Sequence, residues 1–180
     1  SKMFLTKKGE TQPTLSQDGV LAVATPGLVR GLHDIHKRFG RLPWKDCVEP
    51  AVKIAREGFP LYPQLQEALI DRKDVLWDDP EARATFFTKE GTVPLLAKTL
   101  EKIGREGAVA FYEGDIAASI IKTIRDNGGI MTHKDLREYK MKERDPVTGS
   151  YKGLKIFSMP PPSSGGIHVI QILKMLEPYN

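Results

Sequence analysis

The sequence predicts a helix-rich α+β protein whose sheet is incomplete. Six segments repeat apolar residues every three or four positions, which is the spacing of one helix face. About three segments have the short apolar or alternating pattern of strands. A chain of 180 residues with 40% hydrophobic and 28% charged residues has the length and composition of one compact unit.

The first elements are read from residues 3–40. A short apolar run at 3–5 begins abruptly, like the end of a longer strand, and the run at 20–24 predicts a buried strand. Thr25 is expected to cap the next helix, with Pro26 in its first turn, where no backbone donor is missed. Helical periodicity then continues over 28–39, and a glycine ends it.

Helical patterns dominate the middle of the chain. The segment 43–56 has one apolar side, but Pro50 lies in its interior and should kink the helix or split it in two. Further helices are expected over 63–72, from Asp78-Asp79-Pro80 through Phe86, and over 94–105 and 115–126.

After residue 130 the period changes. Thr132 is expected to cap a short helix with Asp135 as the reciprocal partner of a capping box. The runs at 147–151 and 154–157, joined by Lys152-Gly153, predict a hairpin. A last helix over 165–176 is apolar on most of its sides and would need cover all round.

Composition excludes several classes of protein. The 27 Lys and Arg and 23 Asp and Glu give a net charge of only +4, and the cations alternate with acids, so no nucleic-acid partner is expected. No apolar run approaches the roughly 20 residues of a membrane span. The single Cys47 cannot form an internal disulfide or a thiolate metal site alone, and we expect it to be buried and unreactive.

The residues that could do chemistry do not combine into a site. His33 and His36 lie three apart on one helix without the spacing of a metal motif, so both are interpreted as structural. His133 is expected to face water, and His168 to bond to backbone in the last helix. No nucleophile, base and oxyanion donors come together, so no catalytic, substrate-binding, cofactor or metal residue is assigned.

The most unusual stretch is Ser163-Ser164-Gly165-Gly166, which opens the last helix. Its backbone donors could hold an anion, although the Lys of a phosphate loop is missing. The alternative is a strand-to-helix turn that needs a hydroxyl cap and slender glycines for close packing. Whether Ser163 and Ser164 contribute to any site stays open.

The order of motifs resembles the gamma-glutamyltranspeptidase family over nearly the whole chain. Each motif alone is weak, but their order and spacing together are specific. They are Thr25-Pro26-Gly27, Arg38-Phe39-Gly40, Glu49-Pro50-Ala51, Ala55-Arg56-Glu57-Gly58-Phe59, Ala110-Phe111-Tyr112-Glu113-Gly114, Asn127-Gly128-Gly129-Ile130-Met131-Thr132, Tyr151-Lys152-Gly153 and Ser158-Met159-Pro160-Pro161-Pro162-Ser163-Ser164-Gly165-Gly166-Ile167-His168.

The resemblance implies an N-terminal-nucleophile hydrolase of αββα fold, made as a precursor that cleaves itself into a large and a small subunit. The Thr that begins the small subunit would attack the gamma-glutamyl amide of glutathione, with its own amine as base and no cofactor. No position here matches the family's Thr-Thr-His junction. The resemblance therefore makes residues 1–180 a single partial domain inside the large subunit, inactive alone.

Further expectations follow from the resemblance. The partners would be the rest of the precursor, its small catalytic subunit and a gamma-glutamyl small molecule, and the isolated piece would self-associate or leave one edge loose. The location would be periplasmic or secreted. Two alternatives remain: a sister acylase of the same fold that acts on another amide, and a helical interaction module without chemistry.

Overall fold

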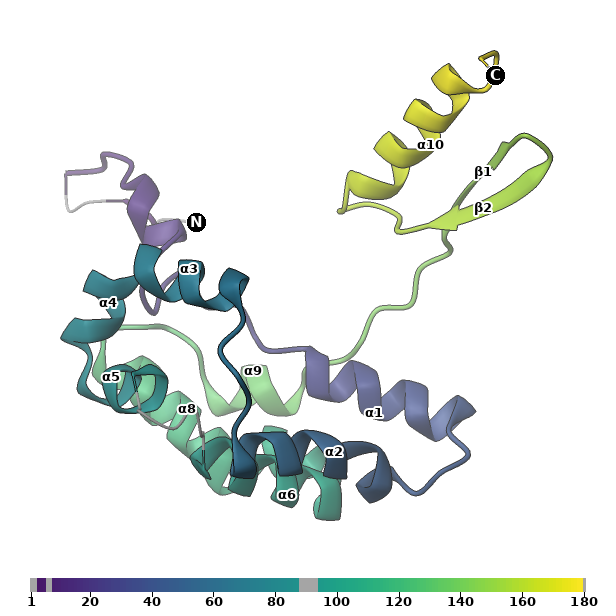
Figure 1. Ribbon diagram of the computed structural model, residues 1–180. Coiled ribbons are helices and arrows are strands. Elements are labelled where there is room, and N and C mark those ends of the chain that lie inside the picture. Colours follow the sequence, from purple (N-terminus) through teal and green to yellow (C-terminus); the bar gives the residue numbers. More distant parts are fainter. Residues whose placement is uncertain (1–2, 6–7, 88–93, 180) are drawn as a thin grey trace. The chain divides into compact units, whose positions relative to one another are not determined.

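The computed structural model describes residues 3–5, 8–87 and 94–179, which fall into two compact units. One unit extends to Lys140 and the other begins at Met141. The described part of the first unit is helical (Figure 1): η1 (Pro13–Ser16), α1 (Leu28–Phe39), α2 (Trp44–Glu57), α3 (Pro63–Asp71), α4 (Lys73–Asp78), α5 (Pro80–Phe86), α6 (Pro94–Glu106), α7 (Val109–Tyr112), α8 (Asp115–Asp126) and α9 (His133–Arg137). The second unit holds β1 (Val147–Tyr151), β2 (Leu154–Ser158) and α10 (Gly165–Leu176).

The N-terminal strands that the sequence predicts are not formed. Residues 20–24 make a turn and an open stretch that is half-buried or exposed, and Leu5 makes a single bridge to Thr11. An apolar run becomes a strand only where a neighbouring strand supplies hydrogen bonds, and the described residues offer none here. The cap of α1 also differs, because Gly27 occupies the N-cap position and no side chain bonds there.

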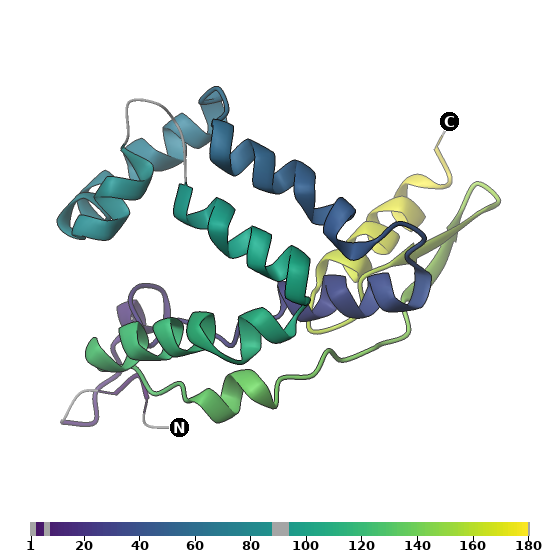
Figure 2. The ribbon, with the colours of Figure 1, turned by 90° about the horizontal axis from the view of Figure 1, so that it is seen from below.

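Helices α2 and α6 lie side by side in both views (Figures 1 and 2). Val52 and Ala55 of α2 are buried, as is Ile103 of α6. The two helices are close enough that a Cβ added at Gly104 would lie 3.5 Å from Val48 Cβ, an ordinary van der Waals contact. The helix α2 is continuous through Pro50, so of the two predicted outcomes, a kink or a split, the split is wrong. A proline leaves only one backbone bond unmade, and the packing of α2 on α6 offsets that loss.

The structure also contains short helices that the sequence analysis did not predict. The helices α4 and α7 are one to two turns long, too short to show a periodic pattern. The expected start of α5 is confirmed, since the Asp79 carboxylate accepts the Ala82 N–H at 2.7 Å.

The main core of the first unit lies where α7, α8 and α9 meet. Tyr112, Ile121 and Ile124 pack there with Leu136, which is fully buried. The predicted capping box fixes the start of α9: Thr132 Oγ1 accepts the Asp135 N–H, and Asp135 Oδ2 accepts the Thr132 N–H at 2.8 Å. Hydrogen bonds from Thr132 lower the pKa of the Asp135 carboxyl.

The second unit is a hairpin packed on one helix. The strands β1 and β2 are antiparallel, and Lys152 and Gly153 both have positive φ, as a two-residue hairpin turn requires. Ile170 of α10 lies against Gly149, where a Cβ would be only 2.7 Å from its Cγ2. Within the second unit the other sides of α10 stay open, and Met175 is 73% exposed. The hairpin of this unit therefore does not by itself cover the apolar last helix.

Candidate functional site

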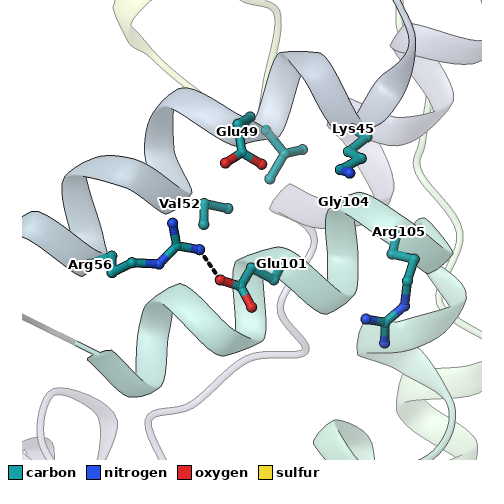
Figure 3. A pocket seen from close by; sticks show the side chains of 8 residues that line it. Lys45, Glu49, Val52, Arg56, Glu101, Gly104 and Arg105 are labelled. Atoms are coloured by element: carbon teal, nitrogen blue, oxygen red, sulfur yellow. Dashed lines mark hydrogen bonds and ion pairs between the residues drawn. The ribbon is translucent and has the colours of Figure 1, made fainter.

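A charged hollow of about 320 Å³ lies between α2 and α6 (Figure 3). Val48, Val52 and Gly104 line it together with charged side chains, which are Lys45, Glu49, Arg56, Glu101 and Arg105. None of these lining residues carries the hydroxyl or thiol that acyl-transfer enzymes commonly use as the nucleophile.

The charges of this hollow join the two helices. Arg56 donates to Glu101 across the gap, as the dashed line in Figure 3 shows, and this hydrogen bond raises the pKa of the Arg56 guanidinium. The two side chains are 53% and 41% exposed, and water screens the attraction of such an exposed ion pair, so the pair contributes little to stability. The hollow is therefore a contact between helices, with ordinary solvated charges.

A second, apolar groove of about 540 Å³ lies along α1, α2 and α6. Its lining includes the apolar stripe of α1, in which Leu28 is 73% exposed. Cys47 also lines it and is exposed, so the prediction that this thiol is buried is wrong. A periodic pattern shows that one side of a helix is apolar, but it does not show that the described chain covers that side.

Tyr112 organises the most connected polar cluster of the first unit. Its side chain is 1% exposed, its hydroxyl donates to the Pro26 carbonyl at 2.6 Å, and it accepts the Arg30 N–H at 3.1 Å. The Arg30 guanidinium lies 4.6 Å from the Tyr112 ring, and Tyr139 stacks on that ring at 6.0 Å. Burial raises the pKa of the Tyr112 hydroxyl. A protonated phenol with two partners holds the start of α1 in place, which is a structural role.

Two of the four histidines meet at one tryptophan, and the other two lie elsewhere in the chain. His33 and His36 both meet Trp44 edge-on, at 5.1 and 5.2 Å between ring centroids, as structural side chains do. His133 is exposed, as predicted. His168 is exposed as well, and the structure records no bond from its ring to backbone, so that prediction is wrong. Its place in the first turn of α10 leaves the ring outside the packed side of the helix.

The Ser163–Gly166 turn is built for packing. Ser164 occupies the N-cap position of α10, but it is the Ser163 hydroxyl that accepts the Gly165 N–H, at 3.3 Å. Gly166 is buried, and a Cβ there would overlap the Met159 carbonyl oxygen. Close backbone approach therefore explains one of the two glycines.

No group of three or more His, Cys, Asp or Glu that could hold a metal occurs among residues 3–5, 8–87 and 94–179. Over the same residues, no helix has the length and apolarity to cross a membrane. The structure thus assigns the described chain no metal centre, and its hollows belong to helix packing.

The family model described as "Gamma-glutamyltranspeptidase" matches residues 1–180. The chain belongs to the gamma-glutamyltranspeptidase family. It is 39% identical over 188 residues to the glutathione hydrolase proenzyme of Escherichia coli K12, covering 99% of this chain and 32% of that protein. It is also 34% identical to the acylase ACY 1 proenzyme of a Pseudomonas species (strain SE83), covering 97% of this chain and 33% of that protein.

Among solved structures, the Helicobacter pylori gamma-glutamyltranspeptidase aligns with a TM-score of 0.90 and 40% identity. The alignment covers 100% of this chain and 54% of that chain. The fold is therefore the helix-rich α+β part of an N-terminal-nucleophile hydrolase, as the resemblance implied, and the family is one of enzymes. The chain spans about a third of the length of the curated gamma-glutamyltranspeptidase relatives that it matches.

Proposed function

We propose that this chain is an internal segment of the large subunit of a gamma-glutamyltransferase or glutathione hydrolase, and that residues 1–180 form one partial domain of it. The observation that carries the proposal is the match of the whole chain to about half of a solved gamma-glutamyltranspeptidase chain at 40% identity. The relatives that carry the word proenzyme in their names support a precursor that matures by cleavage.

The chemistry proposed for the intact protein belongs to residues outside this chain. A Thr hydroxyl at the start of the small subunit attacks the gamma-glutamyl amide carbonyl and expels the amine, which leaves an acyl-enzyme ester. Water, an amino acid or a peptide amine then attacks the ester and frees the Thr hydroxyl. No metal or organic cofactor takes part in the proposed reaction.

The segment itself is proposed to be scaffold. Its hollows are lined by exposed ion pairs or by apolar side chains, and its buried Tyr112 hydroxyl is held by backbone groups rather than by a base. Its macromolecular partners would be the remainder of the precursor and the small catalytic subunit. Their surfaces would cover the exposed apolar sides of α1 and α10.

The test is expression of the full reading frame that contains this chain. We expect self-cleavage into two chains and turnover of a gamma-glutamyl anilide by the product, with no turnover by the 180-residue chain. Turnover by the short chain would overturn the scaffold role. A full-length product that neither cleaves itself nor hydrolyses the anilide would overturn the assignment and favour a helical interaction module.

A sister acylase is the second candidate, and the acylase ACY 1 relative at 34% identity favours it. The same full-length product distinguishes the two when it is offered a gamma-glutamyl anilide and a beta-lactam with an acyl side chain. If the product prefers the beta-lactam amide, the proposed activity would be that of an acylase and not that of a glutathione hydrolase.

Two further properties are proposed for the protein. The isolated chain self-associates through exposed apolar side chains of α10, such as Ile172 and Met175. Sedimentation as a compact monomer would contradict this. The intact protein is exported to the periplasm or secreted, which fractionation of cells that express the full reading frame would test.

A further inference from the structure

His33 lies where α1 meets two other elements of the first unit. On one side, its ring meets the edge of Trp44, the first residue of α2, with centroids 5.1 Å apart and planes at 78°. On another, its Nε2 edge faces Gly107 in the turn between α6 and α7, where a Cβ would be only 2.7 Å away. The Trp44 indole N–H in turn donates to the Ile103 carbonyl at 2.8 Å.

One ring nitrogen of His33 lacks a hydrogen-bond partner. Nδ1 is buried and has no hydrogen-bond partner in the described structure. A neutral imidazole can leave one nitrogen as an acceptor without a proton, but the protonated ring carries N–H groups at both positions. Protonation would therefore place a positive charge and an unpaired donor in this contact, which is costly where water is excluded.

The charged groups around His33 oppose its protonation on balance. Arg30, His36 and Lys37 of α1 disfavour the cation, and Asp34 of α1 favours it. The contacts from the packed elements, Trp44 of α2 and Gly107 of the turn, carry no charge.

Two cations lie on those packed elements. Arg105 pairs with Glu106 at 2.6 Å, and Lys45 lines the hollow between α2 and α6. Burial is the largest cause that lowers the pKa of His33 below 6.5, followed by Lys37.

We propose that His33 makes the docking of α1 sensitive to pH, so that α1 packs on Trp44 and Gly107 while the imidazole is neutral and loosens when it is protonated. The neighbouring His36 differs, because its Nε2–H donates to the Leu42 carbonyl at 2.7 Å.

The direction of the effect follows from linkage. When α1 is loosened, His33 has its ordinary pKa of 6.5, and when α1 is docked, the pKa of His33 is lower. The docked state is therefore destabilised relative to the loosened state as the pH falls from 6.5 to the docked pKa. Between these two values the opening equilibrium changes by at most about tenfold for each pH unit, and below the docked pKa the loss is complete.

Hydrogen exchange on the 180-residue chain at pH 7.5 and pH 5.0, corrected for intrinsic exchange, tests the proposal. We expect the amides of α1 to lose protection several-fold at pH 5.0 while those of α8 do not. His33→Gln should abolish the difference between the two pH values, and the matched variant His36→Gln should retain it. A loss shared equally by α1 and α8, or an unchanged loss in His33→Gln, would overturn the proposal.

A second measurement does not depend on any variant folding. The imidazole proton resonances of the wild-type chain, followed by NMR from pH 4.5 to 8, give the pKa of His33 directly. A value below 6.5 that coincides with the loss of α1 protection supports the proposal, and a value at or above 6.5 refutes it.

Discussion

The Tyr112 hydroxyl offers the sharpest test of how α1 is held. Tyr112→Phe keeps the buried ring, its stacking on Tyr139 and the Arg30 contact, but it removes the bonds to the Pro26 carbonyl and from the Arg30 N–H. A backbone group that loses its partner costs about 1–3 kcal/mol, depending on how fully it is buried. Because Pro26 and Arg30 are only half-buried, we take about 1 kcal/mol for each and expect a loss of about 2 kcal/mol.

Urea unfolding followed by tryptophan fluorescence measures this loss. Both tryptophans of the chain, Trp44 and Trp77, lie in the first unit, so the signal reports on the unit that contains Tyr112. With a slope of about 2 kcal/mol per M, the urea midpoint should fall by about 1 M. Tyr62→Phe is the matched control, because that side chain is 54% exposed, and its midpoint should not move.

A midpoint of Tyr112→Phe within about 0.2 M of the wild type, at an unchanged slope, would refute the reasoning. It would mean that the Pro26 carbonyl and the Arg30 N–H are equally well satisfied by water, so that the cluster does not hold α1. An equal fall in Tyr62→Phe would show instead that loss of any phenol hydroxyl destabilises the chain.

Two other predictions concern the same structure. Gly166→Ala should destabilise the second unit by about 1–3 kcal/mol, because the new methyl group overlaps the Met159 carbonyl oxygen and lies 3.0 Å from its nitrogen. Exchange of hairpin amides should rise in this variant and not in Gly165→Ala, whose new Cβ would meet the Ser163 Oγ at 3.5 Å, an ordinary van der Waals contact. Equal behaviour of the two variants would contradict the packing explanation. Burial raises the Tyr112 pKa above 10.0, so the contribution of its hydroxyl is complete below pH 10 and is lost as the pH rises through the folded-state value. The stability difference between wild type and Tyr112→Phe should therefore shrink at high pH, and a constant difference up to pH 12 would contradict the assigned role.

Local signals in the sequence predicted the local structure well. The Thr132 and Asp135 capping box and the Lys152-Gly153 turn are confirmed, because each depends on residues within a few positions of one another. The strand expected at 20–24 is not formed, because a strand is stable only when a second strand pairs with it. The residues of an apolar run do not show whether such a partner is present.

Contacts between distant residues could not be read from the chain. The hydroxyl of Tyr112 joins a carbonyl 86 positions earlier, and no periodic pattern encodes that distance. The exposure of Cys47 was missed because its helix face is apolar in sequence but is left uncovered by the described residues. No catalytic residue was assigned because the candidate side chains do not combine into a site and because the resemblance places the catalytic residues outside this chain; this stays a prediction.

The 86-residue separation between Pro26 and Tyr112 also bears on synthesis of the chain. At about 5–20 residues per second, a ribosome takes about 4–17 s to add the residues between them. During that interval α1 has emerged, but the Tyr112 hydroxyl that holds its start has not. The order of synthesis therefore delays the anchoring of α1, and a smaller sequence separation between the two residues would shorten that delay.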